Sequence, residues 1–99
     1  MRPLSPRQKT YIEYRLQGYP PIISARLAGY PDNGGSQIRV AAHRLEHSEN
    51  VNNAICYDAL KRWRKGRAVA VVALEKLATW NGASERQRGR IKAKLETAA

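Results

Sequence analysis

The sequence predicts an all-α protein, and two observations support that fold class. Apolar residues recur three and four positions apart in several segments, whereas no segment alternates apolar and polar residues as a half-buried strand does. Serine, proline and glycine, which begin or end helices, separate these segments at short intervals. The 99 residues suffice for one small domain, or for a small domain with an appendage.

The first helix is expected over Leu4–Gln17. Ser5 is a good N-cap residue, a proline follows it at the first helical position, and Gln8 completes a Ser-x-x-Gln capping box. Gly18 comes next as a stop signal. The residues expected to face inward form one stripe, which consists of Tyr11, Ile12 and Leu16.

The second helix is expected from about Pro21 to Ala28. Ile23 and Leu27 are four positions apart, so both are expected to face inward. Ala25 is small, which suits a position where another helix approaches closely. Gly29 then ends the helix through a left-handed backbone conformation, and a proline two residues later prevents its continuation.

The third helix is expected from near Ser36, a good N-cap residue, to about Glu46. Its buried side is expected to consist of Ile38, Ala42 and Leu45. The opposite side and its flanks are mostly polar and consist of Ser36, Gln37, Arg39, Val40, His43, Arg44 and His47.

Two short helices joined by a glycine-containing turn are the signature of a helix-turn-helix motif. A helix with one apolar side and one side of hydrogen-bond donors fits a DNA groove, so our main hypothesis is DNA binding by this third helix. The residues predicted to carry it are Ser36, Gln37, Arg39, Val40, His43 and Arg44. Helical bundles that contact no nucleic acid also contain two helices with such a turn, and that alternative stays open here.

Ser48 is expected to cap a fourth helix with a wide apolar band, which suits a helix packed on two sides. The single cysteine, Cys56, has no intrachain partner, which suits a buried apolar role and a reducing compartment. The helix ends in five cations within seven residues, namely Lys61, Arg62, Arg64, Lys65 and Arg67, and we call residues 61–67 the basic run. Such a run can bind phosphates, or it can complement the negative end of a helix.

Residues 68–80 differ in character, because AVAVVALEKLATW has only two charged members. A helix that is apolar on nearly all sides must be enclosed, either as a central core helix or by self-association, which is slightly favoured. Ser84 and Gln87 form a second capping box, which starts a last helix that extends to about Thr97. Gly89 inside this helix costs about 1 kcal/mol relative to alanine, so the helix is expected to depend on packing.

The charge of the chain indicates a polyanionic partner. There are 18 Lys and Arg against 8 Asp and Glu, a formal net charge of +10, and nucleic acid is a commoner partner of such a surface than a membrane. A basic surface kept for solubility is the alternative. Residues 51–99 have 11 cations and 4 anions and therefore carry most of the excess. The predicted organisation is a helix-turn-helix DNA-binding domain in residues 1–65 and a helical hairpin for oligomerisation in residues 66–99.

One string has a pattern typical of catalysis. Residues 43–47, HRLEH, match the H-x-x-E-H pattern of certain zinc peptidases, which also need a third protein ligand and an enclosing cleft. The nearby candidates Glu49, Cys56 and Asp58 lack a diagnostic spacing. Gly34-Gly35 is not followed by the Lys-Ser/Thr of a phosphate loop, and no Ser/His/Asp set has a nucleophile context. We therefore expect no catalysis, no metal and no cofactor.

Three stretches together resemble the start of tailed-phage terminase small subunits: LSPRQKTYIEY, GYPPIISARLAGY and HRLEHSENVNNAI. The chain departs from the family pattern at Pro31–Gly35, where the turn is about three residues longer, and at Ser48-Glu49, which replaces a proline. The matching positions are Leu4, Pro6, Gln8, Tyr11, Ala25, Ala28, Gly29, Tyr30, Arg44, Leu45 and Val51.

This resemblance implies a non-catalytic component of a DNA-packaging motor. Such proteins assemble as rings, recognise double-stranded viral DNA at the packaging start site and deliver it to the large subunit, which holds the ATPase and the nuclease. The resemblance also implies that the matching Arg44 could tie helices together through an acid such as Glu46. No run is long enough to cross a membrane and the N-terminus lacks an apolar signal core, so a cytoplasmic location is expected. The resemblance implies that this is the cytoplasm of the infected bacterial host.

Two alternatives stay open. A small helix-turn-helix transcriptional repressor would share the DNA-binding residues and would be expected to act as a dimer on a palindromic site. A helical assembly module that binds no DNA would use the two-helix motif only for packing.

Overall fold

The computed structural model of the protein describes residues 3–32 and 36–98, so Asn33, Gly34 and Gly35 of the expected long turn lie outside the described residues. Within these ranges the structure holds six α-helices and no strand, which confirms the predicted all-α class. None of these described helices has the length and the apolar character that a membrane crossing requires. The helices are α1 (Pro6–Leu16), α2 (Pro21–Leu27), α3 (Gln37–Glu46), α4 (Glu49–Arg64), α5 (Val71–Ala78) and α6 (Glu85–Ala98).

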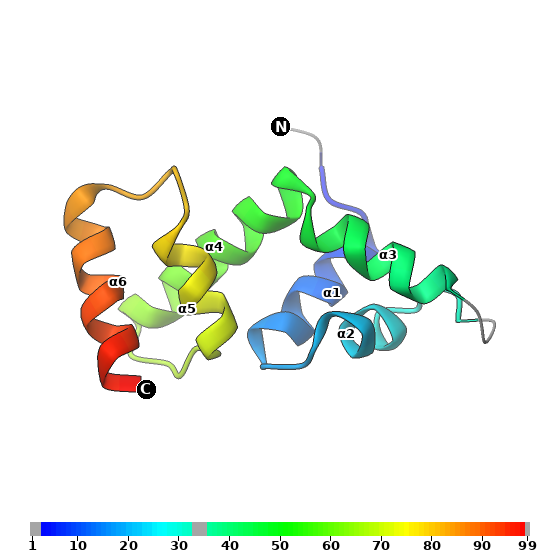
Figure 1. Ribbon diagram of the computed structural model, residues 1–99, viewed down its shortest axis with the longest axis horizontal. Helices are drawn as coiled ribbons and strands as arrows, with labels where there is room; N and C mark the ends of the chain where they lie inside the picture. Colours follow the sequence, from blue (N-terminus) through cyan, green and yellow to red (C-terminus); the bar gives the residue numbers. More distant parts are fainter. Residues whose placement is uncertain (1–2, 33–35, 99) are drawn as a thin grey trace.

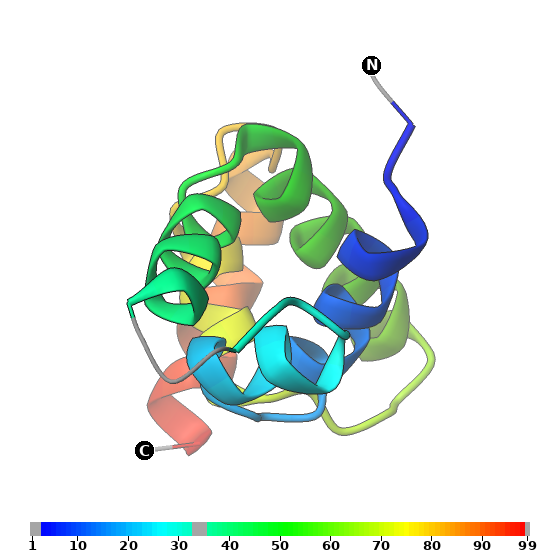
Figure 2. The same cartoon turned by 90° about the vertical axis from the view of Figure 1, so that its right-hand side faces the viewer.

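The helices form an elongated body with α1, α2 and α3 towards one end and α6 at the other (Figure 1). α4 runs between these ends, and α5 packs against both α4 and α6. The principal extents are 43 × 31 × 20 Å, and the shortest of them equals about two helix diameters, so the body is two layers thick. Figure 2 looks along the long axis and shows α3 on one side of the body and the end of α4 on the other.

Local sequence signals start the helices largely as predicted. The Gln8 N–H donates to Ser5 Oγ at 3.2 Å and the Ser5 N–H donates to Gln8 Oε1 at 2.9 Å, which completes the first capping box. The same reciprocal pair joins Ser84 and Gln87 before α6. Ser36 precedes α3 with a helical backbone, φ −79° and ψ −3°, and its hydroxyl makes no capping bond. The expected capping by Ser36 is therefore wrong, because a capping side chain needs an extended backbone to reach the free N–H groups.

One hydrophobic core runs through the molecule and confirms the inward stripes predicted for the first and third helices and the wide apolar band predicted for the fourth. Cys56 is part of it, and burial raises the pKa of its thiol to about 11, so the thiol stays protonated at neutral pH. The largest fully buried apolar side chains are those of Tyr11, Val51, Ile55, Leu77 and Ile91.

α2 presents a different face to the core from the one predicted. Ile23 and Leu27 are 39% and 47% exposed, so the expectation that they face inward is wrong. The buried residues of this region are small: Ser24, Ala25 and Ala28. Because α2 packs against both α1 and α3, small side chains on its inner face let the three helices approach closely, and the larger side chains turn outward.

α5 is shorter than predicted and is only partly covered by the core of the chain. It starts at Val71 rather than at Ala68, since residues 67–70 form a non-helical linker that reverses the chain after α4. Its buried side consists of Ala73, Leu74 and Leu77. Val71 is 49% and Val72 is 37% exposed, so the core of this chain does not enclose the helix as the central-core alternative expects, and enclosure by self-association stays a prediction. The segment is an amphipathic helix that leaves two valines on the surface.

Gly89→Ala is expected to stabilise the protein by about 1 kcal/mol, because Gly89 lies inside α6 and a methyl group there would meet no atom within 4 Å. Urea denaturation followed by circular dichroism measures the change. Gly18→Ala is the matched control and is expected to destabilise, because Gly18 has a φ of 100° that alanine rarely adopts. An unchanged midpoint for Gly89→Ala would show that α6 does not contribute to the cooperative unfolding transition.

Candidate nucleic-acid interface

The residues of α3 that are predicted to bind DNA share one exposed side of the helix. The opposite side buries Ile38, Ala42 and Leu45 against the core, as predicted. The exposed side includes one apolar residue, Val40, which is 45% exposed. The residues that the structure places on the exposed side are Ser36, Gln37, Arg39, Val40, His43, Arg44 and His47, and we call them the α3 face.

A buried ion-pair network fixes the C-terminal end of α3. Arg15 of α1 donates from Nη2 to Glu46 Oε1 at 2.6 Å and from Nη1 to the carbonyl oxygen of Tyr19 at 2.7 Å. Lys76 of α5 donates to Glu46 Oε2 at 3.0 Å and to Asn52 Oδ1 at 2.7 Å. The Asn52 side chain also donates to the carbonyl oxygen of Glu46 at 2.9 Å. The Glu46 carboxylate therefore joins α1, α3 and α5, and Asn52 links α4 to the same network.

This network was not predicted from the sequence. The resemblance suggested Arg44 as a partner of Glu46, but the structure places the Arg44 side chain on the exposed α3 face and pairs Glu46 with Arg15 and Lys76. The burial of Arg15 could have been predicted, because Arg15 lies four positions after Tyr11 and therefore falls on the inward stripe of α1. A charge on an inward stripe requires a partner.

The acid stability of the protein is expected to depend on Glu46. Burial raises the pKa of the Glu46 carboxyl, but the hydrogen bond from Lys76 and the charge of Arg15 outweigh it, so its pKa lies below the ordinary value of 4.5. A depressed pKa in the folded state contributes stability that is present above about pH 4.5 and is lost as the pH falls through the folded-state pKa. Urea midpoints between pH 7 and pH 3 should therefore fall less steeply in Glu46→Gln than in wild type. Parallel profiles would contradict this assignment.

The two histidines of the α3 face stack on each other. Their ring centroids lie 4.1 Å apart, and His47 Nδ1 lies 2.9 Å from the carbonyl oxygen of His43. Because a carbonyl oxygen only accepts, Nδ1 of His47 is the donor in this hydrogen bond. Glu46, the acid of the H-x-x-E-H string, is bound by Arg15 and Lys76. In residues 3–32 and 36–98 no three His, Cys, Asp or Glu side chains are grouped to hold a metal ion.

An apolar groove borders the α3 face, and the sequence analysis did not predict it. It has a volume of about 340 Å³ and lies between the start of α2 and α3. Its lining includes Pro21 and Ile22 of α2 together with Ala42 and His43 of α3. The polar groups on the exposed side of α3 therefore lie next to an apolar groove.

The basic run does not join the α3 face. Figures 1 and 2 both place the end of α4 and the following linker on the side of the body away from α3. Within the run, Arg62 forms an ion pair with Glu13 of α1, which lowers the pKa of the Glu13 carboxyl, and Trp63 packs on the core. The exposed cations that remain in the run are Lys61, Arg64, Lys65 and Arg67. The structure thus divides the predicted DNA-binding residues between two surfaces.

Comparisons of the chain with protein-family models, with curated proteins and with solved structures gave no match.

Proposed function

We propose that the protein binds double-stranded DNA through the α3 face and serves as the small subunit of a viral terminase. In this role it recognises viral DNA at the packaging start site and delivers it to the large subunit. One observation carries the DNA-binding part of the proposal. The polar residues expected to read DNA share the exposed side of α3, whose other side is buried and whose end is fixed by Glu46. The resemblance to terminase small subunits supports the packaging role.

The chemistry of the α3 face supports this proposal. Within the described residues, neither Arg39 nor Arg44 has an ion pair, so both guanidinium groups are available for phosphates or for the acceptors on guanine. His43 adds a hydrogen-bonding ring, and the apolar groove beside it suits contact with a thymine methyl group. We infer that the basic run, on the other surface, contributes non-specific attraction to phosphates.

Exposed apolar residues support self-association, which the packaging role requires. Ile23 and Leu27 of α2 and Val71 and Val72 of α5 are each more than one third exposed. A ring multiplies weak contacts, because several subunits on one duplex bind more tightly than each subunit alone. Light scattering on a sizing column tests this point. A discrete assembly larger than a dimer supports the terminase proposal, whereas a dimer supports the repressor.

Arg39→Ala is expected to weaken binding to duplex DNA by about 1–3 kcal/mol, because a positioned arginine on a recognition helix contributes about that much. Fluorescence anisotropy with a labelled duplex from a packaging start site measures the affinity, at two salt concentrations. His43→Ala is expected to weaken the same complex. Lys65→Ala tests the basic run and should weaken binding to all sequences alike.

Arg90→Ala is the matched control, since it removes one exposed cation of α6 away from the α3 face. It is expected to change the affinity less than Arg39→Ala does. If Arg39→Ala and His43→Ala bind as wild type does, α3 is not the reading helix.

A further inference from the structure

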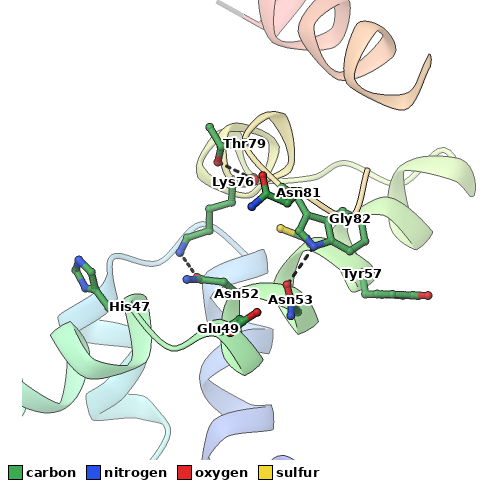
Figure 3. Close-up of a pocket in the computed structure, with 11 residues that line it drawn as sticks. His47, Glu49, Asn52, Asn53, Tyr57, Lys76, Thr79, Asn81 and Gly82 are labelled. Atoms are coloured by element: carbon green, nitrogen blue, oxygen red, sulfur yellow. Dashed lines mark hydrogen bonds between the residues drawn. The ribbon is translucent and has the colours of Figure 1, made fainter. Parts of the chain in front are cut away.

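A second concave site lies away from the α3 face. It is a cavity of about 830 Å³ between the first half of α4 and the segment that joins α5 to α6. Figure 3 shows Asn52 and Asn53 projecting from α4 towards Lys76, Thr79 and Asn81 on the other side. The cavity is large enough for a small organic ligand, since ligand pockets have volumes of about 300–1,000 Å³.

One wall of the cavity is aromatic, and contacts with neighbouring residues hold its indole ring in place. The rings of Tyr57 and Trp80 meet edge to face with centroids 5.6 Å apart, and Tyr57 is 57% exposed. The Trp80 Nε1–H donates to Asn53 Oδ1 at 3.1 Å. Gly82 lets the chain pass close to the indole, because a Cβ there would lie 2.8 Å from Trp80 Cε2. The Trp80 indole is therefore held from two sides before any ligand binds.

The polar groups of the cavity have unused hydrogen-bonding capacity. An indole N–H only donates, so the Asn53 atom that faces it is the oxygen, and the amide nitrogen of Asn53 is left with two donors. Asn81 is exposed, and within the described residues its amide has no hydrogen bond, so it offers both a donor and an acceptor. Asn52, in contrast, uses its oxygen for Lys76 and its nitrogen for the Glu46 carbonyl.

The charge balance of the cavity disfavours a simple anion. Its ammonium group, Lys76, is already paired with the Glu46 carboxylate at 3.0 Å. The lining adds one carboxylate, Glu49, and one imidazole, His47. An aromatic wall beside amide donors and acceptors matches a planar heteroaromatic ring with N–H and C=O groups on its edge. Nucleobases are the common biological ligands of that kind, and proteins bind them by stacking on aromatic rings and by hydrogen bonds to their edges.

We propose that this cavity binds an unpaired nucleobase, which stacks on the exposed Tyr57 ring beside Trp80 and receives hydrogen bonds from Asn53 and Asn81. The base can belong to a free nucleotide or to a single-stranded segment of DNA. The inference goes beyond duplex binding by the α3 face, and neither proposal requires the other.

Nuclear magnetic resonance of the full chain tests the proposal. The four nucleoside 5′-monophosphates are titrated separately, and the Trp80 indole N–H and the Asn53 side-chain amide are followed. These signals should shift with nucleoside monophosphates and should not shift with ribose 5-phosphate, which lacks a base. A single-stranded oligonucleotide that shifts them when mononucleotides do not would support the proposal and assign the base to a DNA strand.

Two variants and a control sharpen the test. Tyr57→Ala removes the exposed ring and should weaken binding about tenfold, since stacking of one base contributes about that much or more. Asn81 lies in an exposed segment, so Asn81→Ala should weaken binding without unfolding the protein. Tyr19→Ala removes another exposed tyrosine ring outside the cavity and should leave binding unchanged.

The proposal is overturned if no mononucleotide or oligonucleotide shifts the two signals, or if ribose 5-phosphate shifts them equally. It is also overturned if Tyr57→Ala and Asn81→Ala bind as wild type does. The two proposed sites fail separately: Arg39→Ala should keep the nucleotide response, and Tyr57→Ala should keep the affinity for duplex DNA.

Discussion

Glu46→Ala is expected to lower the free energy of unfolding by about 3–5 kcal/mol, because it leaves a buried positive charge without its partner. Arg15 has a side-chain exposure of only 5%, so water cannot replace the lost carboxylate. Lys76, 20% exposed, loses its ion pair in the same variant. Removing the carboxylate therefore leaves two cations near each other, and their repulsion adds to the cost of burial.

Urea denaturation at pH 7, followed by circular dichroism, measures this loss. Glu75→Ala is the matched control, because Glu75 is an exposed carboxylate of α5 without an ion pair in the described residues, and it should change stability by less than about 0.5 kcal/mol. If the two variants lose the same stability, the Glu46 network does not hold the helices together. Glu46→Ala is also expected to reduce duplex affinity, because the network fixes the end of α3.

Leu77→Ala is expected to lower the free energy of unfolding by about 2–5 kcal/mol, the usual range for a fully buried leucine. Leu77 is 0% exposed and belongs to the same core cluster as Tyr11 of α1 and Ile55 of α4. Its truncation therefore leaves a cavity among helices from both halves of the chain. A loss of this size would show that α5 is part of the common core.

Val72→Ala is the control for this variant, since Val72 lies on the same helix but is 37% exposed. It should change stability by less than about 0.5 kcal/mol. The shape of the unfolding curve is a second readout. A single transition in wild type and in Leu77→Ala is expected if residues 1–65 and 66–99 unfold together, whereas two transitions would support the predicted division into two domains.

The proposals for function rest on different observations. DNA binding by the α3 face depends on the exposed side of one helix, and the packaging role depends on the resemblance in the first 55 or so residues. The nucleobase cavity depends on contacts between α4 and the segment after α5, in the part of the chain that the resemblance covers least. Each therefore needs its own variants.

Features that depend only on neighbouring residues could be predicted from the sequence. The two Ser-x-x-Gln boxes, at Ser5 and Ser84, form as predicted, because each joins side chains and backbone three residues apart. Gly29 ends α2 with a φ of 95°, which few other residues adopt. The buried and exposed sides of α3 were also predictable, because its apolar residues follow a single helical stripe.

Local sequence patterns could not predict which helix faces pack together. Ile23 and Leu27 have helical spacing, but the small residues on the other side of α2 allow closer packing, so the apolar pair is on the surface. The partners of Glu46 are 31 and 30 positions away in sequence, and no local pattern identifies contacts at that separation. The same holds for the basic run, which lies across the body from α3, and for the cavity beside Trp80. These features depend on how whole helices pack, because burial and charge pairing are set by the complete arrangement of the chain.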